Sequence, residues 1–207
     1  MFDDRADAAA ALAERLDEWR GHHPLVLAIP CGGVPLGHVI AQRLGGELDV
    51  VLVRKLGAPG NPELAVGAVD EGGGVTVAPF AHTLGADAAY LEAETQRQRA
   101  AIRARRAQLG TSRPALDPAG RVVIVVDDGL ATGATMMAAL RTVRARKPQT
   151  LVCAVPVAPQ DTLDAVAALA DAVVCVEVPR DFHAVGQYYR DFPQVDDAQV
   201  AALLAGS

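Results

Sequence analysis

Short runs of valine, leucine and isoleucine, separated by segments of helical character, limit the fold of this chain more than any other feature. The runs do not alternate with polar residues, so each strand is expected to be covered on both faces. This pattern predicts an α/β protein with a mainly parallel central sheet and helices on both faces. The strands are expected at residues 25–29, 49–53, 121–126, 150–157 and 172–178, and the helices at 6–20, up to about 44, 87–108, 134–146 and 160–169.

Length and composition exclude several classes of protein. A chain of 207 residues is expected to form one domain with a small appendage at most. A net charge of −6 argues against a general affinity for nucleic acid. No apolar run approaches the roughly 20 residues that span a membrane, and the acidic start is unlike a secretory signal, so a cytoplasmic protein is expected. The three cysteines predict neither a disulfide framework nor a zinc site.

The residues after the run 122–126 carry the strongest functional signal, because ligands of parallel sheets bind beyond the carboxyl ends of the strands. Asp127 and Asp128 are adjacent carboxylates, which accept the hydrogen bonds that a vicinal diol donates. The small residues from Gly129 to Thr135 lead directly into a helix, whose free N–H groups suit a phosphate. Joined, the two halves predict a site for a ribose 5-phosphate. Taken one at a time, the acidic pair would be explained by two solvated aspartates and the residues 129–135 by an ordinary capped turn.

The run from Val123 to Thr135 closely resembles the signature with which type I phosphoribosyltransferases bind 5-phosphoribosyl-1-pyrophosphate (PRPP). It is not a Walker loop, because it lacks Gly-Lys-Ser/Thr, and the chain contains no GxGxxG fingerprint. The resemblance extends from about Leu25 to Phe192. It implies that Asp127 and Asp128 hold the ribose hydroxyls and that the 5-phosphate is bound by the turn residues Gly129, Ala131, Thr132, Gly133, Ala134 and Thr135.

Two other strand ends fit the same resemblance. The first strand is followed by Cys31, Gly32 and Gly33, which resemble the family's pyrophosphate loop and would contact the leaving group. Arg54 and Lys55 resemble the cations that follow the equivalent strand in adenine and orotate enzymes, and they would bind pyrophosphate. A simple tight turn and a pair of solvated cations are the alternative explanations. Cys31 is expected to be a passive thiol.

Three segments outside these loops have less specific patterns. Residues 70–74 have the composition of a hairpin turn between short strands at 65–69 and 75–78. Residues 57–63 are loop-forming throughout, and either a static turn or the mobile loop that closes over PRPP in the family would account for them. Residues 82–116 form a helical insertion in which Arg99, Arg103 and Arg106 share one face. A solvated face is favoured for them, with a lid or a dimer contact as alternatives.

The C-terminal segment, residues 179–207, is expected to form a small hood on a phosphoribosyltransferase core of residues 1–178. Phe182, Val185 and Gly186 resemble the hood of purine phosphoribosyltransferases and would bind the acceptor, with Phe182 stacking on its base. The neighbouring aromatic residues are expected to fasten the hood as a small core of Tyr188, Tyr189 and Phe192.

The resemblance implies an enzyme that transfers the phosphoribosyl group of PRPP to a nitrogenous, nucleobase-like acceptor and releases pyrophosphate. Mg²⁺, held mainly by PRPP, and the residues Arg54, Lys55, Asp127 and Asp128 are expected to support the reaction. Ala131 stands where hypoxanthine-guanine enzymes carry an aspartate, which argues against that chemistry. The partners are then small molecules, not nucleic acid or membrane. A PRPP-sensing regulatory protein is the main alternative, and the acceptor and a homo-oligomeric state stay open.

Overall fold

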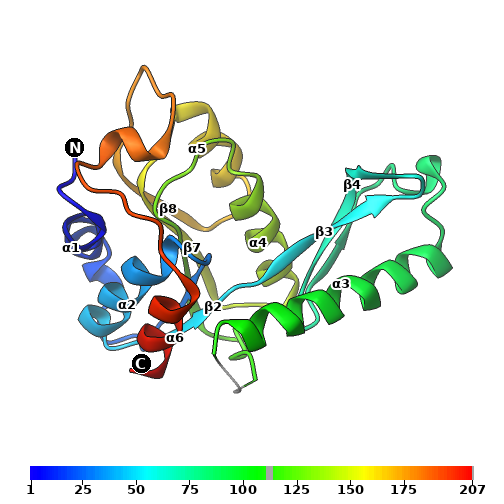
Figure 1. Cartoon of the computed structure of the whole chain (residues 1–207), viewed down its shortest axis with the longest axis horizontal. Helices are drawn as coiled ribbons and strands as arrows, with labels where there is room; N and C mark the ends of the chain where they lie inside the picture. Colours follow the sequence, from blue (N-terminus) through cyan, green and yellow to red (C-terminus); the bar gives the residue numbers. More distant parts are fainter. Residues whose placement is uncertain (111–113, 207) are drawn as a thin grey trace.

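The computed structural model describes residues 1–110 and 114–206. Its centre is a five-stranded parallel sheet with the strand order β2-β1-β6-β7-β8 (Figure 1). The strands are β1 (Leu25–Ala28), β2 (Glu47–Val50), β6 (Val122–Val126), β7 (Thr150–Val157) and β8 (Ala172–Glu177). Every pair of neighbours is parallel, and Ala28 of β1 lies between Val50 and Val126. The central sheet predicted from the sequence is confirmed.

Helices cover both faces of this sheet (Figure 1). One face carries α1 (Arg5–Arg15), α2 (Gly33–Leu44) and α6 (Asp197–Ala205), and the other carries α4 (Ala134–Ala145) and α5 (Gln160–Ala167). Successive residues of β6 face opposite sides, since Ile124 lies in the core under α1 and α2 while Val125 lies in the core under α4 and α5. Burial on both sides explains why these strands are apolar without alternation.

A second, antiparallel sheet stands apart from the first. It contains β3 (Val53–Ala58), β4 (Asn61–Asp70) and β5 (Val75–Val77), and the long helix α3 (Ala88–Gln108) packs along it. We call these four elements the arm; Figure 1 shows it extending away from the parallel sheet. The predicted hairpin turn at residues 70–74 is confirmed, because Val69 of β4 pairs with Val75 of β5.

The arm corrects two predictions from the sequence. The strand expected at residues 49–53 ends at Val50, and the chain enters a different sheet at Val53. Arg54 and Lys55 therefore lie inside β3 and not beyond the end of a parallel strand. Residues 57–63, expected to be a loop, belong to β3 and β4 except at the turn around Gly60, whose φ of +73° suits glycine. Pairing between the two strands overrides the loop-like composition.

The remaining elements are short. They include a C-terminal helix that the sequence analysis did not predict, α6, which begins with a capping box between Asp196 and Gln199 and buries Val200 and Leu204. The first helix ends at Arg15, earlier than expected. The 3₁₀ segments are η1 (Asp17–Trp19), η2 (His82–Leu84) and η3 (Val185–Tyr188). Within the described part of the chain, no helix combines the length and the apolar character needed to cross a membrane.

Candidate active site

The adjacent carboxylates lie where β6 ends, beside the loop that follows β1. Oδ1 of Asp127 accepts the amide of Asp128 at 2.9 Å, and Oδ2 of Asp128 accepts Nε and Nη2 of Arg5 at 3.0 and 2.8 Å. Burial raises the pKa of Asp127 to about 8, and the charge of Asp128 adds to the rise. Burial also raises the pKa of Asp128, against the opposing effect of the Arg5 guanidinium. The pair is therefore short of positive charge and hydrogen-bond donors.

The turn after the carboxylates leaves the start of α4 open. Gly133 is the N-cap residue, with φ +71°, and no side chain caps the helix. Oγ1 of Thr132 lies 3.5 Å from the amide of Ala134, which is a long contact. Thr132, Ala134 and Thr135 are exposed. Because the first N–H groups of a helix lack partners within it, this end offers amides, hydroxyls and a positive dipole end to an anion.

A contact with α5 fixes the shape of this turn. The hydroxyl of Thr162 donates to the carbonyl oxygen of Ala131 at 2.7 Å. A Cβ atom on Gly133 would lie 2.7 Å from Cγ2 of Thr162, so the residue must be glycine both for its φ and for the space. The contact with α5 thus uses the carbonyl oxygen of Ala131 and leaves the hydroxyls of Thr132 and Thr135 on the exposed side of the turn.

The loop after β1 packs directly on the carboxylates. A Cβ atom on Gly32 would lie 2.1 Å from Oδ2 of Asp128, and one on Gly33 would lie 2.6 Å from the carbonyl oxygen of Val126. The peptide bond between Pro30 and Cys31 is cis. Glycine is required at both positions because the two loops touch. The structure therefore brings together two of the segments that the sequence analysis selected.

Cys31 is held by two charged residues from distant parts of the chain. Nη2 of Arg105 lies 3.3 Å from its Sγ, and Sγ lies 3.6 Å from Oδ1 of Asp197. Arg105 and Asp197 form a bidentate ion pair at 2.6 and 2.8 Å. Burial raises the pKa of the Cys31 thiol, Arg105 lowers it and Asp197 raises it, with a net rise. This environment is consistent with a passive thiol, and it ties α3 and α6 to the loop.

A cleft of about 580 Å³ opens between this loop and the C-terminal segment. Its volume suits a small organic ligand. From the core it is lined by Arg5, Cys31, Gly32 and Asp128, and from the C-terminal segment by Val185, Phe192, Pro193, Gln194 and Val195. Among the described residues, neither Asp127 nor the turn at the start of α4 lines the cleft, although both are next to the lining residue Asp128 along the chain.

The aromatic residues of the C-terminal segment fall into two groups. Tyr189 is 6% exposed and packs between Phe2 and Phe192, with ring centroids 5.5 and 4.7 Å apart. Its hydroxyl donates to the main-chain oxygen of Asp128 at 2.6 Å. This group, against which Tyr188 also packs, is the small core that was expected for Tyr188, Tyr189 and Phe192, and it holds the C-terminal segment against the carboxylates.

The second group is a stacked pair outside the cleft. The ring of Phe182 lies on that of Tyr188, with centroids 5.6 Å apart and planes at 7°. Phe182 is not among the residues that line the cleft, whereas Val185 is. Gly186 lies against Phe192, because a Cβ atom there would be 3.1 Å from the ring. Three residues were predicted to bind the acceptor. Of these, Val185 lines the cleft, Gly186 lies against the ring of Phe192, and Phe182 does not line the cleft.

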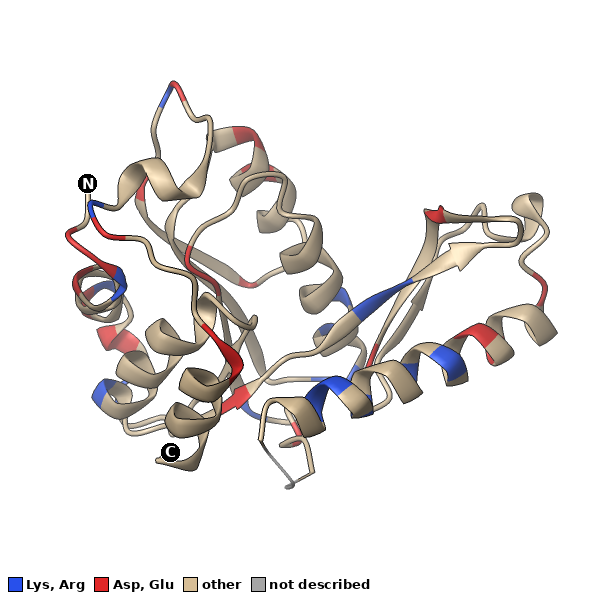
Figure 2. Ribbon diagram, viewed as in Figure 1, with Lys and Arg blue, Asp and Glu red and all other residues tan. Residues whose placement is uncertain are grey.

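Arg54 and Lys55 lie on the arm, where Figure 2 shows basic residues along β3 and α3. Nε of Arg54 donates to Oε1 of Gln98 at 2.8 Å, and Nζ of Lys55 pairs with Glu63 at 2.7 Å. Neither residue lines the cleft. Lys55 lines a second, more apolar groove of about 570 Å³ between the arm and α4, which also includes Ala134.

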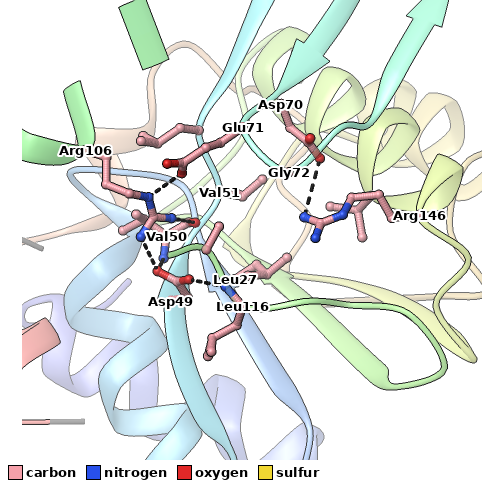
Figure 3. A pocket seen from close by; sticks show the side chains of 13 residues that line it. Leu27, Asp49, Val50, Val51, Asp70, Glu71, Gly72, Arg106, Leu116 and Arg146 are labelled. Carbon is pink, nitrogen blue, oxygen red and sulfur yellow. Dashed lines mark hydrogen bonds and ion pairs between the residues drawn. The ribbon is translucent and has the colours of Figure 1, made fainter. Parts of the chain in front are cut away.

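The arginines of α3 do not form the uniformly solvated face that the sequence favoured. Arg103 is exposed as expected, but Arg106 is 4% exposed and pairs with Asp49 and Glu71 (Figure 3). Nη1 of Arg106 donates to Oδ1 of Asp49 at 3.0 Å. Buried guanidinium and carboxylate groups compensate each other's charge, which a spacing pattern along one helix does not reveal.

This ion pair belongs to a buried network at the base of the arm. Asp49 also accepts the amides of Val50 and Leu116, at 2.8 and 2.9 Å. On the other side of the small cavity in Figure 3, the guanidinium of Arg146 lies 4.0 Å from the carboxylate of Asp70. The network joins the arm, through α3 and the β4–β5 turn, to β2 and α4.

Comparison with known proteins agrees with this arrangement. The sequence model of a family described as the phosphoribosyl transferase domain matches residues 2–193. The chain belongs to the phosphoribosyl transferase family. The resemblance that the sequence analysis drew from residues 123–135 is therefore confirmed for the family and for the fold.

Relatives of this phosphoribosyl transferase domain are known in bacteria. Two curated proteins of Mycobacterium tuberculosis, named "Putative phosphoribosyl transferase MT0597" and "Putative phosphoribosyl transferase Rv0571c", are each 43% identical over 206 residues. The alignment covers 99% of this chain but 46% of each relative, so the chain spans about half their length. The crystal structure of TT1426 from Thermus thermophilus is 50% identical, with a TM-score of 0.88, and the match covers 99% of this chain and 98% of that one.

Proposed function

We propose that this protein transfers the 5-phosphoribosyl group of PRPP to a nitrogenous, nucleobase-like acceptor and releases pyrophosphate. One observation carries the proposal: at the carboxyl edge of the sheet, the carboxylate pair packs on the glycine loop after β1 and is followed directly by the turn into the uncapped start of α4. A diol, a 5-phosphate and a pyrophosphate are the three polar parts of PRPP, and each has a matching group there.

In this proposal each segment binds one part of PRPP. Asp127 and Asp128 accept the ribose hydroxyls, and residues 129–135 bind the 5-phosphate. The loop of Cys31, Gly32 and Gly33 binds the pyrophosphate. The acceptor nitrogen forms a bond to C1 of the ribose as the bond from C1 to the pyrophosphate oxygen breaks. The electron pair of that bond leaves with pyrophosphate, and the acceptor nitrogen gives up its proton. Preorganised groups around the reacting centre supply most of the rate enhancement.

Arg54 and Lys55 take part in this scheme only if the arm moves relative to the cleft. Lys55 is the better placed, because it shares a groove with Ala134 of the phosphate turn. We assign both residues to a closed form in which their charges neutralise the leaving group and the arm excludes water. In this closed form, the residues of the C-terminal segment that line the cleft, Val185 in particular, would face the acceptor.

Mg²⁺ fits this site as a companion of the substrate. No cluster of three or more histidine, cysteine or acidic residues within the described ranges could hold a metal ion alone. Mg²⁺ is commonly bound through substrate phosphates with few protein ligands, which agrees with entry together with the pyrophosphate of PRPP. When bound, the ion would neutralise charge on the departing pyrophosphate.

A screen for pyrophosphate release tests the proposal. The protein is incubated with PRPP, Mg²⁺ and single nucleobases or related amines, and pyrophosphate is measured with a coupled assay. We expect at least one acceptor to give release that depends on both substrates and that falls by tenfold or more, about the effect of a lost charged hydrogen bond, in Asp128→Asn. Binding of PRPP without release for every acceptor would contradict the transferase proposal and favour a PRPP-sensing protein.

A further inference from the structure

Arg5 is a buried charge in the cleft to which the family resemblance assigned no role. It begins α1, is 9% exposed and lines the cleft beside Asp128. Its guanidinium lies over the ring of Phe192, 3.9 Å from the centroid, and its Nη1 donates to the carbonyl oxygen of Pro193 at 2.6 Å. Nε and Nη2 both reach Oδ2 of Asp128. An arginine held on three sides is a fixed part of the site.

The hydrogen bonds of this region divide the carboxylate oxygens into two sets. Oδ2 of Asp128 is taken by Arg5, and Oδ1 of Asp127 is taken by the amide of Asp128. Among residues 1–110 and 114–206, no side chain donates a hydrogen bond to the second oxygen of either carboxylate. One acceptor oxygen is left on each aspartate, which matches the two hydroxyls of a vicinal diol.

We infer that Arg5 is a positioning residue of the PRPP site, which neutralises the charge of Asp128 and directs its free oxygen at a ribose hydroxyl. This inference rests on the proposed function, because it concerns how the same diol is bound. A two-donor contact from one guanidinium to a single carboxylate oxygen fixes the rotation of that carboxylate. Phe192 and Pro193 in turn fix the guanidinium, so the C-terminal segment helps to set the geometry of Asp128.

The electrostatic surroundings of Asp128 favour the same role. The charged and titratable groups around it are the neighbouring Asp127, Arg5 of α1, the hydroxyl of Tyr189 and the thiol of Cys31 in the facing loop. Of these, only Arg5 brings a positive charge into direct contact with the carboxylate. Burial and Asp127 both favour a proton on the acidic pair, and Arg5 opposes it.

The test compares PRPP binding, with Mg²⁺ present, across pH 6 to 9 in the wild type, Arg5→Gln, Arg5→Lys and the control Arg15→Gln. Arg15 lies on the same helix and is exposed, so its variant should bind as the wild type does. Arg5→Gln should weaken binding at pH 7 by about tenfold or more. The loss of affinity should be largest at the acidic end of this range and should shrink as the pH rises, because removal of Arg5 raises the pKa of Asp128 further and favours its protonated form.

Arg5→Lys distinguishes the effect of the positive charge from that of the two-donor contact. It also allows the inference to be tested if Arg5→Gln does not fold. A lysine keeps the charge but not the forked contact, so its pH profile should stay close to that of the wild type while its affinity falls. Unchanged affinity and pH profile in both Arg5 variants would overturn the inference, as would tighter binding, which would make Arg5 a competitor of the diol. Failure of the wild type itself to bind PRPP would instead reject the proposed function.

Discussion

Replacement of Arg106 by methionine is expected to lower the free energy of unfolding by about 3–5 kcal/mol, because it leaves a buried carboxylate without its partner. Asp49 is fully buried, and the two amides that it accepts from Val50 and Leu116 do not neutralise its charge. Glu71 loses its guanidinium partner as well. The effect should be measured by urea unfolding followed by circular dichroism.

The matched control is Arg103→Met, because Arg103 is an exposed arginine on the same helix. Its replacement should change stability by no more than about 0.5 kcal/mol. If Arg106→Met were as mild as this control, the network at the base of the arm would not be what joins the arm to the parallel sheet.

Tyr189→Ala is also expected to lower the free energy of unfolding by about 3–5 kcal/mol, because it removes a buried ring. Tyr189 packs between Phe2 and Phe192 and holds the main-chain oxygen of Asp128. Tyr189→Phe should cost only about 1 kcal/mol, since it removes the hydroxyl alone. Both values are measurable in the same urea experiment.

Phe182→Ala provides the contrast, because that ring is half-buried and stacks on Tyr188 outside the cleft. We expect a loss of about 1 kcal/mol, the order of one aromatic pair. The role of Phe182 in stacking on the acceptor stays a prediction, and it requires that the ring leave Tyr188. A destabilisation equal to that of Tyr189→Ala would make Phe182 a core residue and would remove the reason to assign it to the acceptor.

The elements that the sequence predicted well are those that one local pattern determines. Residues 122–126 are apolar because both faces of β6 are covered, and the same run is followed by the acidic and glycine-rich turn that identified the family. Burial on both faces and an acidic, glycine-rich turn each produce a recognisable pattern within about a dozen consecutive residues. The parallel sheet and the phosphoribosyl transferase fold could be predicted from such local patterns.

The arm was mispredicted because its structure depends on pairing between segments. Residues 57–63 contain the glycine, proline and asparagine of a loop, yet they form the tight end of a hairpin in which Ala58 pairs with Asn61. This error also affected the predicted site, because Arg54 and Lys55 were expected at the end of a parallel strand and lie within β3. The turn signal at Gly60, between two short runs, is the local feature that would have indicated the hairpin.

Ion pairs between residues far apart in the sequence could not be predicted from any local pattern. Arg5 meets Asp128 across 123 positions of sequence, and Arg105 meets Asp197 across 92. Each looks like an ordinary helical arginine until the fold places an acidic residue beside it. The buried Arg106 was hidden in the same way, since its spacing on α3 is equally compatible with a solvated face.

The central claim is that Asp127 and Asp128 hold the diol of PRPP, and a calorimetric titration of PRPP with Mg²⁺ tests it most directly. The account predicts saturable binding by the wild type and binding at least about tenfold weaker in each of Asp127→Asn and Asp128→Asn, with folding unchanged. Since the pKa of Asp127 is raised to about 8, wild-type affinity should increase as the pH rises through that value and level off above it, and Asp127→Asn should lose this component. Absence of binding by the folded wild type, or undiminished binding by both variants, would contradict the account.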